Sequence, residues 1–279
     1  FKKKVVIWVL DLWPNTIVDL NILKNKFIIR IFQKIMNYIY DNSDLILAQS
    51  EPIKDEIQKI TKTKCIYFPS WPESNIDENK VIYSTKIKHK DKKTCRIMFT
   101  GNIGEAQSLE TLIEAALILK KTEKIEWIIV GDGRWKSRLI RVIKKKNLEK
   151  DILLLDSVPV IEMQSFFNHA DALYLSLKNN PTFNKTIPGK LQTYMSAQKP
   201  IIASISGETN KLIKNINCGL ASEAENVDQL IENIKKFINL TDKQKSSLAY
   251  NGKNYAEKYF NKKIILNNLE KEIKEIINL

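Results

Sequence analysis

Histidine, cysteine and glycine are all scarce in this 279-residue sequence, which holds two, three and eight of them. Cys65, Cys95 and Cys218 lie far apart and show no CxxC or Cys/His spacing, which argues against a disulfide framework and against a zinc site. Neither His89 nor His169 has a second ligand at a useful spacing. We therefore expect no metal centre.

Long apolar runs are also lacking. No stretch approaches the roughly 20 residues that a membrane-spanning helix needs, and the apolar segment 5–10 is too short for a secretory signal. Only five of the 45 basic residues are arginine, although the formal net charge is +13. The lysines are scattered and no basic-aromatic motif occurs, so we expect no nucleic-acid partner. Attraction to an anionic substrate or an anionic membrane surface stays open, and we expect a cytoplasmic protein.

The length leaves room for two domains. A polar stretch without periodicity, residues 69–93, is the best candidate for a linker between them. We therefore predict an N-terminal domain with its linker in residues 1–90, a second domain in residues 91–250, and C-terminal helices in residues 251–279 that pack back toward the first domain.

Short apolar segments alternate with helical patterns after the linker. This alternation predicts right-handed βαβ crossovers and a doubly wound parallel sheet, hence an α/β fold. The expected strands are residues 96–100, 126–130, 152–155, 172–175 and 201–204. Gly101, Gly131, Val158, Ser176 and Pro188 each follow a strand end, so they share the rim where such sheets bind nucleotides.

The stretch 181–204 combines a polar loop, a helix and a strand. Pro188 suits the first turn of the helix, and Leu191, Tyr194 and Met195 give that helix an apolar face. A helix N-terminus offers free N–H groups and a positive dipole end to a phosphate, and Lys190 adds a charge there. The alternative is a plain connecting loop.

Two features of the first 40 residues allow alternatives. Asp11 follows the strand at residues 5–10, where α/β sheets bind ligands, but it is equally suited to a turn before a proline. Residues 24–40 form a helix with one broad apolar face, which we expect to pack on a sheet. Alternatively, the helix lies on a membrane with Lys24, Lys26, Arg30 and Lys34 among the headgroups.

Five motifs in order along the chain resemble family-4 glycosyltransferases of the GT-B fold, with two Rossmann-like domains. The resemblance is nearest to the bacterial O-antigen and capsule enzymes of the fucosamine-transferase type. The motifs are Leu-Asp-Leu-Trp-Pro at 10–14, Ala-Gln-Ser at 48–50, the glycine loop and helix at 101–112, Val-Gly-Asp-Gly at 130–133 and Thr-Ile-Pro-Gly-Lys-Leu-Gln-Thr-Tyr at 186–194.

The resemblance implies a retaining transfer from a nucleotide-diphosphate sugar, with UDP as the suggested nucleotide, and without a metal or another cofactor. The glycine loop and the helix start at 188–190 would bind the diphosphate, Val158 would lie by the base, Gln192 would bond the ribose and Asn184 would contact the donor sugar. The donor-binding residues implied are Gly101, Asn102, Gly104, Gln107, Gly131, Asp132, Gly133, Val158, Asn184, Ile187, Pro188, Gly189, Leu191 and Gln192.

The sequence departs from the family pattern at the charged positions. Amides stand at both acidic positions, Asn184 and Gln192, and Asn102 and Gln107 replace two cations of the phosphate loop. Lys190 would then stabilise the departing diphosphate as a catalytic residue, with Lys178 or Lys185 as further sources of charge.

Asp11 is the candidate catalytic residue on the acceptor side, where it would orient or deprotonate the acceptor. Leu10 precedes it, at a position where the family often has a histidine.

The resemblance also implies that residues 1–90 are the last part of an incomplete N-terminal domain, with about a hundred residues of it missing. The expected role is transfer of a sugar, an N-acetylated amino sugar in our prediction, to a lipid-linked or saccharide acceptor in surface polysaccharide biosynthesis, with peripheral contact at the inner membrane face. One alternative is a non-catalytic half or subunit of a split transferase that binds the donor. A nucleotide-sugar epimerase is a further alternative, which the shortage of histidine disfavours.

Overall fold

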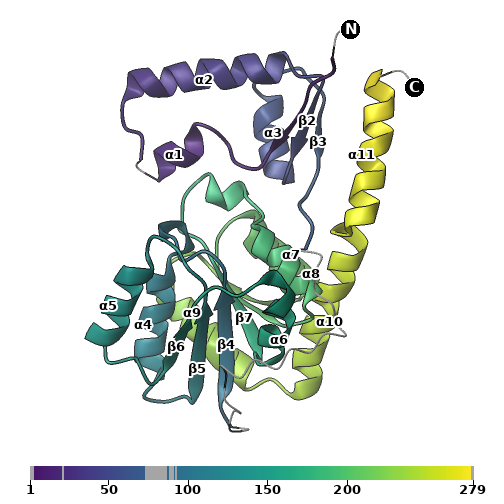
Figure 1. Cartoon of the computed structure of the whole chain (residues 1–279). Helices are drawn as coiled ribbons and strands as arrows, with labels where there is room; N and C mark the ends of the chain where they lie inside the picture. The colour runs from purple at the N-terminus through teal and green to yellow at the C-terminus, as the bar shows by residue number, and fades with distance from the viewer. Residues whose placement is uncertain (1–2, 21, 73–86, 88–90, 92, 278–279) are drawn as a thin grey trace.

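The protein consists of two α/β units with parallel sheets, as Figure 1 shows. The computed structural model describes residues 3–20, 22–72, 87, 91 and 93–277. Every strand pair that it describes is parallel, which confirms the predicted α/β class. The stretch expected as a linker, residues 69–93, lies largely outside the described residues, so its role stays a prediction.

The C-terminal unit is built on a six-stranded sheet in the order β6-β5-β4-β7-β8-β9. Its strands are β4 (Cys95–Thr100), β5 (Ile125–Val130), β6 (Ile152–Leu155), β7 (Ala172–Ser176), β8 (Ile201–Ser204) and β9 (Gly219–Ser222). The chain adds strands outward from β4 in one direction and then returns to start again at β7. In this topology ligands bind at the strand ends beside the point where the order switches, which here lies between β4 and β7.

Helices cover both faces of this sheet. One face packs against α4 (Leu109–Leu119), α5 (Lys136–Lys145) and α9 (Val227–Ile238). The other packs against α6 (Met163–Asn168), α7 (Gly189–Ser196), α8 (Glu208–Ile216) and α10 (Asp242–Tyr259). Strand residues such as Met98 and Ile129 are fully buried on opposite faces, which explains why the strands read as continuous apolar runs.

The N-terminal unit holds a three-stranded sheet in the order β1-β2-β3. Its strands are β1 (Val6–Val9), β2 (Leu45–Ala48) and β3 (Cys65–Tyr67), and its helices are α1 (Asn15–Asp19), α2 (Lys26–Asp41) and α3 (Glu51–Gln58). α3 contributes Ile53 and Ile57 to the core on one face of the sheet, together with Tyr40 from α2.

The α2 helix forms as expected, but its broad apolar face does not pack on the sheet. Phe27 and Tyr38 are 71% and 69% exposed, and Ile35 is 46% exposed. The sheet is contacted instead by Met36 and Tyr40, which lie on another side of the helix. The prediction that this face is covered by a sheet is therefore wrong for the described residues, because helical periodicity reveals an apolar face but not its neighbour.

The last helix, α11 (Lys262–Ile277), returns to the N-terminal unit, as Figure 1 shows. Ile265 and Leu269 of α11 join Leu45, Leu47 and Phe68 in the core on the second face of the small sheet. The chain thus crosses between the units twice, once after β3 and once between α10 and α11.

Candidate functional site

Two glycine loops meet at the carboxyl ends of β4 and β5. The Gly101 N–H donates a hydrogen bond of 2.9 Å to the Val130 carbonyl, and a Cβ on Gly131 would overlap the Gly101 carbonyl oxygen. Gly101 has a φ of +112°, in a region that other residues rarely adopt. The two loops therefore depend on glycine for their close approach.

Lys190 reaches from the first turn of α7 into the Gly101 loop. Its Nζ donates a hydrogen bond of 2.6 Å to Oε1 of Gln107 and lies 4.7 Å from the centre of the Phe99 ring. Any side chain on Gly101 would collide with the Lys190 stem. Lys190 keeps some accessible surface, but burial lowers the pKa of its ammonium to about 8. Among the described residues no carboxylate forms an ion pair with it.

The turns at Gly104 and Gly133 are joined by hydrogen bonds next to this rim. The Ile103 N–H donates to the Asp132 carbonyl at 2.7 Å, and the Asp132 carboxylate accepts from the Gly133 N–H at 2.7 Å. Asn102 is exposed and lies against both glycines. The structure thus brings these predicted residues together.

The Gln192 side chain is not exposed at the rim, as a side chain ready to bond a ribose would be. It is fully buried, and its amide nitrogen faces the carbonyls of Pro188 and Gly189, at 2.8 and 3.2 Å. Its amide oxygen accepts a hydrogen bond of 3.2 Å from the hydroxyl of Ser70. This orientation follows from the hydrogen-bond network. Contact with a ribose would require Ser70 to give way.

Asn184 lies in the loop before α7, where its amide nitrogen donates to the Asn179 side chain at 3.2 Å. The two lysines considered as further cations are neutralised. Lys178 pairs with Glu105 at 2.6 Å, and Lys185 pairs with Glu56 of α3 at 3.2 Å.

Three predicted residues contribute to the core through their side chains. Ile187 and Leu191 are buried, and Val158 packs against the same apolar cluster. Contact between the first two and a donor would therefore have to come from their backbone groups.

Asp11 belongs to the N-terminal unit, at the carboxyl end of β1. Its side chain is accessible to solvent, although desolvation by the surrounding protein raises the pKa of its carboxyl group. It makes no hydrogen bond or ion pair with the described part of the chain.

All three strand-end segments of the N-terminal sheet contact the segment 182–192. The Asp19 carboxylate, after β1, accepts from the Thr182 N–H at 3.2 Å. Ser50, after β2, donates to the Lys185 carbonyl at 2.5 Å, and Ser70, after β3, donates to Gln192. The loop and helix of the candidate donor site are therefore held by both units.

Sequence reasoning missed these contact residues. Ser50 carried a signal, because it reads as the N-cap of a helix, but a cap does not predict a partner 135 residues away. Gly207 was missed as well. Its φ is +73°, and a Cβ on it would overlap the Asn184 carbonyl.

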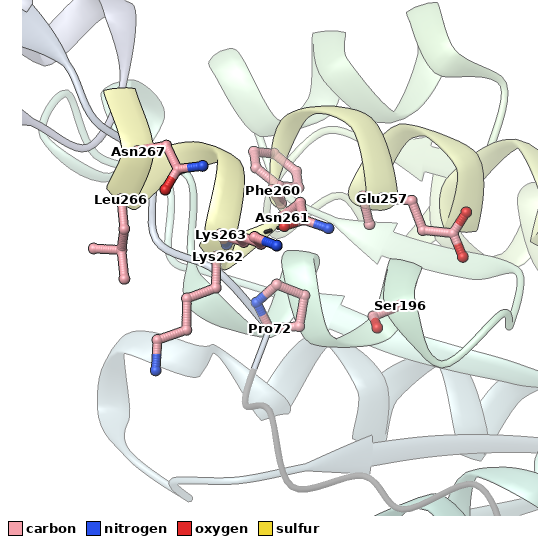
Figure 2. Close-up of a pocket in the computed structure, with 10 residues that line it drawn as sticks. Pro72, Ser196, Glu257, Phe260, Asn261, Lys262, Lys263, Leu266 and Asn267 are labelled. Atoms are coloured by element: carbon pink, nitrogen blue, oxygen red, sulfur yellow. Dashed lines mark hydrogen bonds between the residues drawn. The ribbon is translucent and has the colours of Figure 1, made fainter. Parts of the chain in front are cut away.

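A cavity of about 640 Å³ lies away from this rim, at the bend between α10 and α11, as Figure 2 shows. Pro72, Ser196, Phe260 and Lys262 are among its lining residues. Because the lining comes largely from the two crossings between the units, we interpret the cavity as a space at the crossover rather than as the substrate site.

Neither a metal cluster nor a membrane span is found in the part of the chain that the structure describes. No three His, Cys, Asp or Glu side chains are grouped to hold an ion there, and no helix there is long and apolar enough to cross a bilayer. The expectation of a metal-free reaction stays a prediction.

The sequence model of the glycosyl transferases group 1 matches residues 83–255. This match covers more than half of the chain and includes the glycine loops, Lys190 and Gln192. The chain belongs to the group 1 glycosyltransferases. Its two units with parallel sheets give it the GT-B fold, as predicted.

Two curated relatives support this membership. An uncharacterized glycosyltransferase of Methanocaldococcus jannaschii is 25% identical over 248 residues, which are 89% of this chain and 64% of that protein. The N-acetylgalactosamine-N,N'-diacetylbacillosaminyl-diphospho-undecaprenol 4-alpha-N-acetylgalactosaminyltransferase of Campylobacter jejuni is 31% identical over 141 residues, which are 49% of this chain and 34% of that protein. The glycosyltransferase thus spans less than two thirds of the length of either relative.

Among solved structures, HepE of Anabaena in complex with UDP and glucose superposes with a TM-score of 0.72 at 14% identity. The match covers 98% of this chain and 72% of HepE. At this identity it shows a shared fold. The assignment to the fucosamine-transferase subgroup stays a prediction.

Proposed function

We propose that this glycosyltransferase binds a nucleotide-diphosphate sugar at the rim formed by the Gly101 loop and the start of α7. The proposed nucleotide is UDP. We further propose that it transfers the sugar, an N-acetylated amino sugar, with retention of configuration. The acceptor would be a lipid-linked or saccharide molecule in surface polysaccharide biosynthesis.

One observation carries this proposal. Lys190 is largely enclosed at the rim, yet its partner there is the neutral amide of Gln107, at 2.6 Å, rather than a carboxylate. An enclosed ammonium without a counter-ion favours an incoming anion. The start of α7 adds backbone N–H groups and the positive end of the helix dipole at the same place, and Pro188 provides no capping side chain that would occupy them.

These groups suit the reaction step. As the bond between the sugar carbon and the diphosphate breaks, negative charge grows on the leaving phosphate oxygen. Lys190 and the α7 N–H groups would stabilise that charge, in an enclosed site where such stabilisation is large. Asp11 would orient the acceptor hydroxyl, whose oxygen forms the new bond to the sugar carbon, and its carboxylate would take up the proton that the hydroxyl loses. We also propose that this step proceeds without a metal ion.

Two similar proteins support the chemical class that we propose for the two substrates. HepE is described with bound UDP and glucose, and the name of the Campylobacter jejuni relative specifies an acceptor on diphospho-undecaprenol and transfer of N-acetylgalactosamine. By analogy we propose a UDP-sugar donor and a polyprenyl-diphosphate-linked acceptor here.

Calorimetric titration with UDP tests the donor site. We expect Lys190→Ala to weaken UDP binding by about 10- to 100-fold, the usual range for losing a hydrogen bond to a charged group. Lys236→Ala is the matched control, because Lys236 is exposed near the end of α9. Equal affinities of the wild type and Lys190→Ala would show that the site is assigned wrongly. Titration with UDP-N-acetylglucosamine and UDP-glucose then tests the preference for an amino sugar.

A further inference from the structure

Glu225, in the turn between β9 and α9, contacts two loops that border the candidate donor site. Oε1 of its carboxylate accepts a hydrogen bond of 3.0 Å from the Ser108 hydroxyl. The other oxygen, Oε2, accepts a hydrogen bond of 3.2 Å from the Asn179 N–H. Ser108 lies in the loop after β4 and Asn179 in the loop after β7, the two strands at the switch in the sheet order. One carboxylate thus joins the loops on the two sides of that switch.

The backbone at Glu225 would suit glycine better than glutamate. Its φ is +63°, in the left-handed region, and Ser108, to which it is bonded, has a φ of +45°. The Glu225 N–H donates to the Ser204 hydroxyl at the end of β8, at 3.2 Å, so the turn is fixed to the sheet. A side chain that stands where glycine would be less strained points to a task for that side chain.

The Ser108 end of this bridge leads to the cation of the site. Ser108 directly follows Gln107, whose side-chain oxygen accepts from Nζ of Lys190 at 2.6 Å. The Gln107 carbonyl accepts from the Ser176 hydroxyl at 2.5 Å, which ties the same turn to the end of β7. The position of the amide that holds Lys190 therefore depends on how the two loops are held together.

The Asn179 end leads to the loop that precedes α7. The side-chain oxygen of Asn179 accepts from the amide nitrogen of Asn184 at 3.2 Å, and Asn184 is the residue that the family resemblance places at the donor sugar. Glu225 is thus connected to both sides of the candidate site, to Lys190 through Ser108 and Gln107, and to Asn184 through Asn179.

We propose that Glu225 is a positioning residue of the donor site, whose two carboxylate oxygens hold loops 101–108 and 177–188 at the separation that a diphosphate sugar requires. It acts through Ser108 and Asn179 rather than by touching the donor. This inference rests on the proposed function, because the separation matters only if a donor binds between the loops. The alternative is that the carboxylate, which is exposed, acts through its charge alone and repels a diphosphate.

Glu225→Gly separates positioning from stability. It removes both hydrogen bonds but suits the left-handed backbone, so we expect a melting temperature within about 3 °C of the wild type. Calorimetric titration should show UDP binding that is about tenfold weaker. Asn147→Gly is the matched control, because Asn147 is exposed in the turn after α5 and has a φ of +52°. It should leave UDP binding unchanged.

Glu225→Gln tests whether the hydrogen bonds or the charge matter. Its amide oxygen can accept from the Asn179 N–H, and its amide nitrogen can donate to the Ser108 hydroxyl, which can itself donate to the Thr111 hydroxyl at 3.4 Å. We expect this variant to bind UDP within about twofold of the wild type.

The titration of Lys190 reports on the bridge without any ligand. Burial lowers the pKa of its ammonium to about 8, and NMR of isotope-labelled lysine follows its ε-methylene group, assigned by its loss in Lys190→Arg. Glu225→Gly should raise the titration midpoint, because water reaches the ammonium once Gln107 is free to move. Glu225→Gln should keep the midpoint of the wild type.

Two results would overturn the inference. One is a Glu225→Gly protein that has the UDP affinity and the Lys190 midpoint of the wild type. The other is tighter UDP binding in both Glu225 variants, which would make the carboxylate a repelling charge. The proposed function fails separately: if the wild type does not bind UDP while Glu225→Gly shifts the Lys190 midpoint and Glu225→Gln does not, the donor is wrong and the bridge stands.

Discussion

The Nζ of Lys190 lies 2.6 Å from Oε1 of Gln107, across 83 residues of sequence. The amide is a neutral partner for a cation that is largely enclosed. In the free protein the lysine is therefore held in position without having its charge compensated.

UDP affinity should fall as the pH rises through the pKa of Lys190. Burial lowers that pKa to about 8 in the free protein, and a bound diphosphate should raise it again, so binding above about pH 8 requires uptake of a proton. We expect about tenfold weaker binding at about pH 9 than at about pH 7. Calorimetric titration with UDP in two buffers of different ionisation enthalpy would measure the number of protons taken up on binding. Lys190→Arg keeps its charge throughout and should lose this dependence; a wild type without any pH dependence would contradict the prediction.

Gly131→Ala should destabilise the protein by about 1–3 kcal/mol, because its Cβ would overlap the Gly101 carbonyl oxygen and force the two loops apart. Gly189→Ala is the matched control: a Cβ there meets only the Ser70 hydroxyl, 4.0 Å away, and the residue lies in the first turn of α7. Thermal unfolding of both variants provides the measurement. Equal stability of the two would show that the loops adjust without cost.

Gln192→Glu should be unfavourable in this chain, although the family resemblance implies an acidic residue at this position. The present amide donates to two carbonyls and accepts from a hydroxyl, whereas a carboxylate can accept from the hydroxyl but has no hydrogen to donate to the carbonyls. We expect a loss of about 3 kcal/mol in the free energy of unfolding at neutral pH.

The pH dependence of that loss has a definite sign. Facing two carbonyl oxygens in a buried site, the new carboxyl group should have a raised pKa in the folded state, so the variant is least stable above that pKa and recovers as the pH falls toward the unfolded value. Urea unfolding at several pH values checks this. A loss that does not change with pH would mean that the side chain has moved to solvent.

Ser50→Ala should cost about 2 kcal/mol in stability, because Ser50 both caps α3 and donates to the Lys185 carbonyl at 2.5 Å. Thr241→Ala is the comparison, since Thr241 caps α10 without any such contact between the units, and about 1 kcal/mol is expected. Calorimetric unfolding of the two variants measures the difference. Equal losses would mean that the Ser50–Lys185 bond contributes nothing.

Much of the C-terminal unit could be predicted from the sequence. The strand expected at residues 172–175 is found at Ala172–Ser176, and the helix expected to begin near Pro188 is Gly189–Ser196. Both kinds of element carry strong local signals: fully buried strands are apolar throughout, and helices repeat their apolar residues every three or four positions. The shared rim of the loops followed from the topology alone.

The partners across the rim could not be predicted. Nothing local links Gln192 to Ser70 or Lys190 to Gln107, because these contacts depend on how the loops and units pack. The exposure of the apolar face of α2 could not be predicted either, since an amphipathic pattern does not indicate which part of the protein packs against the apolar side. Three polar residues of the N-terminal unit could not be predicted as contacts for the same reason: Asp19 at the end of α1, Ser50 after β2 and Ser70 after β3.

The return of α11 to the first unit bears on how the protein is made. One face of the β1-β2-β3 sheet, with Leu45, Leu47 and Phe68, is covered by residues 262–277. During vectorial synthesis on the ribosome, the six-stranded sheet and its helices leave the exit tunnel before this cover does. The apolar face of the early strands therefore stays uncovered until a helix roughly 200 residues later has been translated. Chaperones that bind nascent chains are suited to protect this face in the meantime.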